Sequence, residues 1–145
     1  MQIGVIGLGR MGANIARRLM RAGHQCVVFD ANAKPRETLA GEGAAAAPSL
    51  AAVVKALRKP RVVWVMLPAG QPTEETVMAL GEALEAGDTV IDGGNTFYKD
   101  DVRRAKALKQ KGLTYLDVGT SGGVWGLERG YCMMVGGDDE AFERV

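Results

Sequence analysis

The sequence has little of several residue types on which large classes of protein depend. It contains one histidine, two cysteines and 6% aromatic residues, and its 18 basic and 17 acidic residues give a net charge of +1. This balance, with charges dispersed along the chain, gives no electrostatic support for a nucleic-acid or membrane partner. No cluster has the spacing of a metal site, and no Ser-His-Asp arrangement can be built on His24, which we expect at a solvent-facing helix end.

The sequence also lacks a hydrophobic run of the roughly 20 residues needed to cross a bilayer. Residues 1–7 contain neither a basic leader nor a small-residue cleavage site, and they predict a strand rather than a signal peptide. Cys26 and Cys132 both lie in apolar, strand-like runs. Without a secretory signal we expect two buried thiols, no disulfide and a cytoplasmic location.

A length of 145 residues, with 47% hydrophobic and 24% charged residues, fits one globular domain. Short β-rich runs alternate with longer helical periods, which predicts an α/β fold of the Rossmann type: a doubly wound, mainly parallel sheet with helices on both faces. We expect strands at Gln2–Ile6, Gln25–Phe29, Arg61–Leu67, Thr89–Ile91, Leu113–Val118 and Tyr131–Val135. We expect helices at Arg10–Ala22, Lys34–Gly41, 50–57 after the cap Ser49, from Pro72 onward, at Tyr98–Lys111 and at Asp138–Val145. The alanine-rich segment after Gly41 stays unassigned.

Hydrophobic patterning separates the expected core from the expected surface. Arg61–Leu67 is apolar without alternation, so both faces of this strand should be covered, and Trp64 and Met66 should be core residues. The helix Tyr98–Lys111 carries many charges, which we interpret as a solvated face: Lys99, Arg103, Arg104, Lys106 and Lys109.

The segment Gly7–Gly12 has the pattern G-x-G-x-x-G, directly after a predicted strand and at the start of a predicted helix. In a dinucleotide-binding loop Gly7 permits a tight turn, Gly9 leaves room for a diphosphate, and Gly12 lets the helix pack on the strand. Free N–H groups and the helix dipole then stabilise the phosphates. The pattern predicts a cofactor site at Gly7, Leu8, Gly9, Arg10, Met11 and Gly12; the alternative is a glycine-rich turn that only packs.

Asp30 lies at the end of the second predicted strand, 23 positions after Gly7. A carboxylate there accepts hydrogen bonds from the adenosine ribose and repels the 2′-phosphate of NADP, at a cost of a few kcal/mol. We therefore expect NAD as the preferred cofactor. Lys34 and Arg36 follow closely and could hold a 2′-phosphate, which leaves NADP as the alternative cofactor. Asp30 could also be a turn aspartate, because Ala31-Asn32 follows it.

Two further polar segments follow predicted strands. Gly93-Gly94-Asn95 should lie at the carboxyl edge of the sheet, where the Asn95 amide can donate to and accept from a polyhydroxylated ligand; the alternative is a tight turn. Ser121-Gly122-Gly123 offers a hydroxyl and N–H groups to a carboxylate or phosphate, or is a flexible turn. Trp125 and Tyr131 could line a pocket, although packing is an equal interpretation.

Together these segments resemble the decarboxylating 6-phosphogluconate dehydrogenase family, in the β-hydroxyacid dehydrogenase superfamily, over the whole chain. The resemblance is carried by Gly7–Gly12 with Asn14, by Met66-Leu67-Pro68, by 92–98 (Asp-Gly-Gly-Asn-Thr-Phe-Tyr) and by 120–126 (Thr-Ser-Gly-Gly-Val-Trp-Gly). The chain is similar to the short bacterial form. The long form usually has Ser-Gly-Gly-Glu at the last segment and Asn-Arg-Thr at the position of Asp30-Ala31-Asn32, and the second difference agrees with a preference for NAD.

The resemblance implies roles for individual residues. It implies that Leu67, Pro68 and Ala69 line the nicotinamide side of the cofactor, that Asn95 touches cofactor and substrate, and that Ser121, Gly122 and Gly123 hold a small sugar acid. It also implies an oxidative decarboxylation of 6-phosphogluconate to ribulose 5-phosphate, in a homo-oligomeric full-length enzyme.

The acid and base that the resemblance implies are a lysine and a glutamate in an all-helical C-terminal domain, beyond Val145. We therefore expect residues 1–145 to be the NAD(P)-binding domain, because the helix after Asp138 stops within its second turn. On its own this domain should bind the cofactor without turnover.

Two alternatives remain open from the sequence. One is the front half of a 3-hydroxyisobutyrate-type dehydrogenase, although Gly93-Gly94-Asn95 and Val124-Trp125-Gly126 favour the phosphogluconate branch. The other is a non-catalytic dinucleotide-sensing module, which would have no use for Asn95 or for 121–123.

Overall fold

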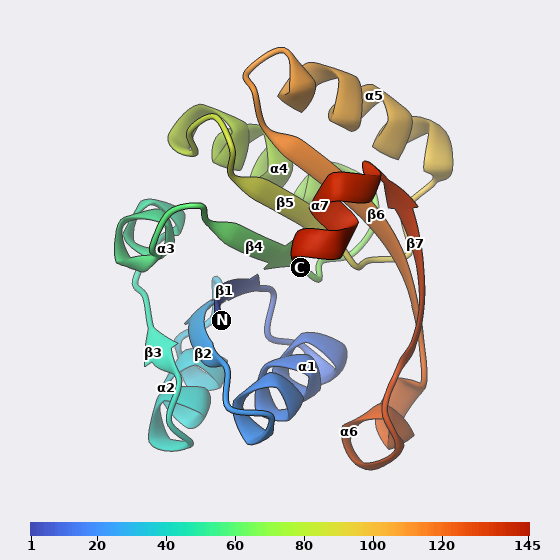
Figure 1. Cartoon of the computed structure of the whole chain (residues 1–145). Helices are drawn as coiled ribbons and strands as arrows, with labels where there is room; N and C mark the ends of the chain where they lie inside the picture. The colour runs from blue at the N-terminus through green and yellow to red at the C-terminus, as the bar shows by residue number, and fades with distance from the viewer.

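Strands and helices alternate along the chain and form a single sheet with helices on both faces (Figure 1). The computed structural model describes residues 1–145. The strands are β1 (Gln2–Ile6), β2 (Gln25–Phe29), β3 (Ala45–Ala46), β4 (Val62–Val65), β5 (Thr89–Asp92), β6 (Thr114–Ser121) and β7 (Cys132–Gly137). The helices are α1 (Arg10–Arg21), α2 (Ala33–Gly41), α3 (Leu50–Ala56), α4 (Gln71–Ala83), α5 (Tyr98–Lys109), α6 (Gly126–Arg129) and α7 (Asp139–Arg144), with a 3-10 turn η1 (Gly123–Trp125) before α6.

The strand order in the sheet is β3-β2-β1-β4-β5-β6-β7. Strands β1 to β6 pair in parallel, and β7 pairs antiparallel with β6. From β1 the chain first moves outward through β2 and β3, then returns to the other side of β1 with β4. This reversal creates the crevice in which doubly wound sheets bind ligands, and it confirms the predicted Rossmann-type fold.

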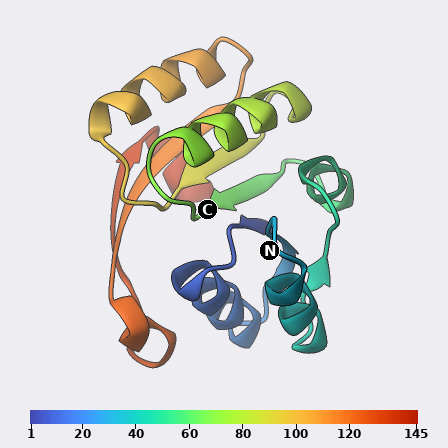
Figure 2. The same cartoon turned by 180° about the vertical axis from the view of Figure 1, so that it is seen from behind.

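Each face of the sheet has its own hydrophobic cluster. Val62 and Trp64 of β4 pack with residues of α1, α2 and α7, whereas Val63 and Val65 pack with residues of α3, α4 and α5. Figure 2 shows the second face from behind, with α4 and α5 over the sheet. Covering on both faces explains the continuous apolar run of β4, because alternate side chains of a strand point to opposite faces. Trp64 is a core residue as predicted, and Met66 is half-buried against the same cluster.

The helix ends confirm the predicted cap at Ser49 and show a second cap at Asp138. The Ser49 hydroxyl accepts a hydrogen bond from the Ala52 N–H, and the Asp138 carboxylate accepts one from the Ala141 N–H, so both residues are N-caps. Pro72 lies in the first turn of α4. None of the helices combines the length and the hydrophobicity that crossing a membrane requires.

Three predictions need correction. Cys132 is exposed, since β7 is an edge strand whose residues are all exposed; Cys26 is buried, and both thiols are free. The strand expected to end at Val118 continues to Ser121, because it pairs with β7. Arg104 is only 1% exposed, so it does not belong to a solvated helix face. Its position in α5 puts it on the same side as Leu108, which faces the sheet.

Candidate functional site

The glycine loop between β1 and α1 is shaped by three glycines with different surroundings. Gly7 has a φ of +86°, and a Cβ there would lie 2.3 Å from the carbonyl oxygen of Met66. A Cβ on Gly12 would lie 1.9 Å from the Gly7 carbonyl oxygen. A Cβ on Gly9 would meet nothing within 4 Å. Gly7 and Gly12 are therefore required by packing, whereas Gly9 faces open space in which a ligand could approach the backbone.

Helix α1 begins beside this open space, and no side chain neutralises the partial positive charge at its N-terminus. No side chain caps the helix, and its first turn contains no acidic residue, whereas Arg18 and Arg21 lie in its last turn. The first N–H groups of the helix and its positive dipole end therefore face the loop uncompensated. The arrangement fits a diphosphate, because an anion can accept hydrogen bonds from these N–H groups and also occupy the space beside Gly9.

Asp30 lies beside the glycine loop at the end of β2. Its Oδ2 accepts the Leu8 N–H at 2.7 Å, and its Oδ1 accepts the Asn32 N–H at 2.8 Å. The hydrogen bond to Asn32 forms the aspartate turn that the sequence allowed as an alternative role for Asp30. The hydrogen bond to Leu8 attaches the carboxylate to the glycine loop. Each carboxylate oxygen keeps a second acceptor site for a ligand hydroxyl.

The two basic residues after Asp30 differ in their freedom. Lys34 is exposed. The Arg36 guanidinium lies 5.7 Å from the centre of the Phe29 ring, and its Nη1 donates to the Pro48 carbonyl at 3.4 Å. Arg36 is therefore held beside Phe29, the last residue of β2, which directly precedes Asp30.

The loops that follow neighbouring strands are linked by backbone hydrogen bonds. Gly7 N–H donates to the Phe29 carbonyl, Met66 N–H to Ile6, and Gly93 N–H to Val65, at 2.8–2.9 Å. The loop ends therefore lie in the order β2, β1, β4, β5 along one edge of the sheet. This places Asp30, the glycine loop, 67–69 and Asn95 in one row, with Asn95, Pro68 and Ala69 exposed.

Ser121, Gly122 and Gly123 lie beyond that row. Asp92 at the end of β5 pairs with Asp117, and β6 continues four residues further to Ser121, roughly 13 Å at about 3.3 Å per residue. Residues 119–131, here called the arm, then turn back toward α1 (Figure 1). The Arg18 guanidinium donates to the Leu127 carbonyl at 3.1 Å, which fixes the arm on α1.

The two aromatic residues of the arm have different environments. Tyr131 is half-buried against the core cluster that contains α1 residues. Trp125 is 66% exposed, with the Arg129 guanidinium 5.3 Å from its ring centre. Tyr131 fits both interpretations, because it packs on the core cluster and also lines an apolar pocket beside Ile15 and Leu19 of α1. The indole of Trp125, in contrast, is free to contact a ligand or another part of a larger molecule.

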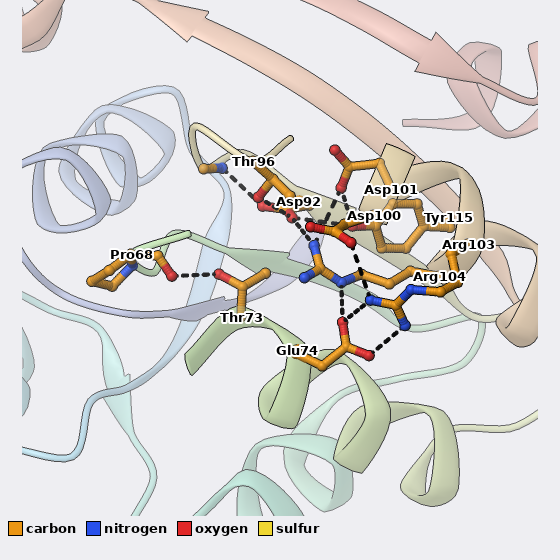
Figure 3. Close-up of polar contacts among 11 residues, drawn as sticks. Pro68, Thr73, Glu74, Asp92, Thr96, Asp100, Asp101, Arg103, Arg104 and Tyr115 are labelled. Atoms are coloured by element: carbon orange, nitrogen blue, oxygen red, sulfur yellow. Dashed lines mark hydrogen bonds and ion pairs between the residues drawn. The ribbon is translucent and has the colours of Figure 1, made fainter. Parts of the chain in front are cut away.

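A buried polar cluster behind the Asn95 loop was missed by the sequence analysis. Asp92 has no exposed surface, and it accepts hydrogen bonds from Gly94 N–H and Thr96 Oγ1, both at 2.9 Å (Figure 3). Tyr115 Oη lies 3.1 Å and Arg104 Nη1 3.5 Å from Asp92 Oδ2. The spacing of Asp101, Arg104 and Leu108 puts them on one face of a helix, which could have indicated burial. Two of the three are charged, so this face does not have the hydrophobic pattern of a buried helix face.

The same cluster connects α5 to α4. Arg104 Nε donates to Glu74 Oε2 at 2.7 Å, and the exposed Arg103 forms two further hydrogen bonds with the same carboxylate. Hydrogen bonds from Arg103, and then from Arg104, lower the pKa of Glu74 to about 2. Glu74 is therefore ionised at neutral pH.

Asp101 is the member of the cluster whose carboxylate is not fully hydrogen-bonded. Its Oδ1 accepts the Tyr115 hydroxyl at 2.7 Å, and its Oδ2 is buried without a partner. Burial, followed by the charges of Asp117 and Asp92, raises the pKa of Asp101 to about 6. Burial also raises the pKa values of Tyr115 and Asp117. The cluster thus holds more carboxylates than Arg104 alone can neutralise.

The loop after β4 is held from the same helix that carries Glu74. Thr73 in α4 is fully buried, and its hydroxyl donates to the Pro68 carbonyl at 2.9 Å (Figure 3). A Cβ on Gly94 would lie 3.0 Å from the Leu67 carbonyl oxygen, so the loops after β4 and β5 also touch each other. Segments 67–69 and 93–96 are therefore one connected unit.

Comparison with known proteins agrees with this geometry. Residues 2–145 match the family model described as the NAD binding domain of 6-phosphogluconate dehydrogenase. The NAD(+)-dependent, decarboxylating 6-phosphogluconate dehydrogenase of Haloferax volcanii is 43% identical over 145 residues, which are 100% of this chain and 48% of that protein. The chain spans about half the length of this curated relative and of one from Bacillus subtilis.

Solved structures that are similar over 99% of the chain include two dehydrogenases. One is 6-phosphogluconate dehydrogenase from Plasmodium falciparum, studied with NADP+ and with 6-phosphogluconate, at a TM-score of 0.91, 30% identity and 32% of that chain. The other is 3-hydroxyisobutyrate dehydrogenase from Mycobacterium tuberculosis, at a TM-score of 0.86, 28% identity and 48% of that chain.

Proposed function

Because the chain belongs to the family of NAD-binding domains of 6-phosphogluconate dehydrogenase, we propose that it is the cofactor-binding part of an enzyme that oxidatively decarboxylates 6-phosphogluconate to ribulose 5-phosphate. The observation that carries the proposal is the open space at Gly9, between two glycines that packing requires and beside the Asp30 carboxylate. In the whole enzyme an all-helical domain follows residues 1–145, which agrees with the half-length match to the relatives.

Each predicted site residue has a task in this proposal. The backbone of 7–12 holds the diphosphate, and Asp30 accepts the adenosine ribose hydroxyls. Leu67, Pro68 and Ala69 line the nicotinamide half, and Asn95 contacts both that half of the cofactor and the substrate beside it. Ser121, Gly122 and Gly123 bind the sugar acid through the hydroxyl and the N–H groups of the arm.

A nicotinamide cofactor held by the glycine loop and Asp30 would supply the acceptor for the hydride that leaves carbon 3 of the substrate. The residues of this chain bind and orient the two molecules, since none of them in the row along the sheet edge is a suitable base for the substrate hydroxyl. The proton transfers of the oxidation and of the later protonation need groups with tuned pKa values. We assign them to the lysine and the glutamate expected beyond Val145.

We further propose that NAD is preferred over NADP. The 2′-phosphate of NADP would lie against the Asp30 carboxylate, and repulsion with a lost hydrogen bond lowers affinity by tens- to hundredsfold, or about 2–3 kcal/mol. Lys34 and Arg36 are the groups that would weaken this preference, so NADP remains the alternative cofactor.

Calorimetric titration with NAD and NADP tests the proposal, with Asp30→Asn as the informative variant. Asparagine keeps an oxygen for the Leu8 N–H and removes the charge, whereas Asp30→Ala would also release the loop. We expect wild type to bind NAD at least tenfold more tightly than NADP, and Asp30→Asn to lose most of this ratio. An unchanged ratio would disprove the carboxylate account of preference, and absence of binding to either nucleotide would disprove the function.

The second candidate is a 3-hydroxyisobutyrate-type dehydrogenase, which the similarity to the M. tuberculosis enzyme favours. Steady-state assays of the whole enzyme with 6-phosphogluconate and with 3-hydroxyisobutyrate separate the two. We expect kcat/KM to be higher for 6-phosphogluconate, and the reverse order would exchange the two candidates.

A further inference from the structure

We propose that Asp92 is a positioning residue that fixes Asn95 for contact with the nicotinamide half of the cofactor. This inference rests on the proposed function, and it concerns a residue that would touch neither cofactor nor substrate. Asp92 is fully buried, and the loop that carries Asn95 starts directly after it.

Asp92 holds the loop on both sides of Asn95. Its Oδ1 accepts the N–H of Gly94, and its Oδ2 accepts the hydroxyl of Thr96. Asn95 lies between these two anchored residues and is itself exposed. The start of the loop is fixed as well, because a Cβ on Gly93 would lie 2.4 Å from the Trp64 ring. The backbone of Asn95 is therefore restrained while its side chain stays available.

Asp92 is in turn held from behind. Tyr115 Oη and Arg104 Nη1 lie 3.1 Å and 3.5 Å from its Oδ2, and Arg104 is 1% exposed. Arg104 also contacts Glu74 at 2.7 Å, and Glu74 follows Thr73, which holds the Pro68 carbonyl (Figure 3). Arg104 therefore connects both loops: it contacts Asp92, which holds the loop with Asn95, and Glu74, which adjoins the residue that holds Pro68.

A purely stabilising role does not account for this cluster. Hydrophobic side chains of similar volume usually stabilise a core as well as a buried ion pair does, so a buried ion pair is weak evidence for a contribution to stability. Here two of the four polar contacts of Asp92 go to a surface loop. The other two lie on its buried side and come from Arg104 and from the Tyr115 hydroxyl, which Asp92 shares with Asp101. Such an arrangement is what holding an exposed polar side chain in a fixed position requires.

The strand order identifies which part of the cofactor the loop faces. Asp30 follows β2 and the glycine loop follows β1, so the adenosine and the diphosphate lie over these strands. The remaining half of the dinucleotide then lies over β4 and β5, where Pro68 and Asn95 are. ADP-ribose, which lacks the nicotinamide, therefore serves as a matched ligand that should not depend on the position of Asn95.

Thr96→Val tests the inference, with Thr96→Ser as its control. Valine has the shape of threonine and removes the hydroxyl that Asp92 accepts, whereas serine retains it. In titrations of the protein we expect Thr96→Val to raise the Kd for NAD about three- to tenfold, the range that corresponds to the net contribution of one ordinary hydrogen bond. The Kd for ADP-ribose should change less than about twofold, and Thr96→Ser should bind both ligands as wild type does.

Hydrogen exchange of the Gly94 amide gives a second readout in the free protein. We expect this amide to exchange slowly in wild type and Thr96→Ser, and faster in Thr96→Val, because the loop loses one of its two anchors. Unchanged NAD affinity in Thr96→Val would overturn this inference and leave the proposed function standing. Equal losses for NAD and ADP-ribose would also overturn it, since they indicate a general change in the fold. Failure of wild type to bind either ligand would refute the proposed function, and the positioning role with it.

Discussion

The two ends of the candidate site are built in different ways. At β1 the loop is shaped by side chains that are missing: Gly7 and Gly12 leave room for neighbouring carbonyl groups, and Gly9 leaves room for a ligand. At β5 the loop is shaped by side chains that are present and charged, since Asp92 and Arg104 are buried behind it. The first end offers a diphosphate nothing but backbone, whereas the second presents one oriented side chain, Asn95. A ligand common to many enzymes suits the first design, and a specific substrate suits the second.

Loss of Arg104 should have the largest effect on stability. Arg104→Met keeps the volume and the hydrophobic stem but leaves Asp92 buried without its cation. Breaking a buried pair in this way costs about 3–5 kcal/mol, which urea unfolding at neutral pH would measure. Arg103→Met is the matched control, because Arg103 also contacts Glu74 but is 55% exposed on its side chain. Equal losses in the free energy of unfolding for the two variants would mean that the buried ion pair contributes no more to stability than the exposed one.

A pair of glycine variants should separate packing from ligand approach at the other end. In Gly12→Ala the added Cβ collides with the Gly7 carbonyl, and we expect a loss of about 1–3 kcal/mol of stability by urea unfolding. In Gly9→Ala the Cβ has open space, so stability should stay within about 0.5 kcal/mol, while NAD binding weakens at least tenfold. Normal NAD affinity in Gly9→Ala would show that the diphosphate does not approach this position.

The pH dependence of stability should report Asp101. Its folded-state pKa, about 6, lies above the unfolded value of roughly 4, so the protonated form stabilises the fold. This contribution is complete below about pH 4 and is lost as the pH rises through about 6; its size is on the order of 3 kcal/mol. Asp101→Asn should remove it, as urea unfolding between pH 4 and 7.5 would show. Parallel pH profiles for variant and wild type would contradict the assignment.

The difference between the two ends also explains what the sequence could predict. The alternation of strand and helix patterns predicted the fold, and the glycine loop, a contiguous segment between a strand and a helix, predicted the position of the cradle from its spacing. The Asp92 cluster joins Asp92, Arg104 and Tyr115, which lie up to 23 positions apart and meet only when β5, α5 and β6 are packed. A charged residue in a charged helix indicates the surface, and Arg104 was therefore placed there wrongly.

Two further misses have a similar physical origin. The apolar run of β7 predicted a buried strand, but an edge strand is covered only if another element packs on it, and Cys132 is exposed. The two residues of β3, Ala45 and Ala46, have no strong strand preference, and their place in the sheet depends on pairing with β2. In both cases the tertiary neighbours, rather than the residues, decide the outcome.

A structure of the protein with NAD bound tests the central claim most directly. The account predicts the diphosphate beside the Cα of Gly9, accepting N–H groups from the first turn of α1, with the ribose hydroxyls on Asp30. A diphosphate bound away from the β1–α1 loop, with Gly9 still facing solvent, would contradict it.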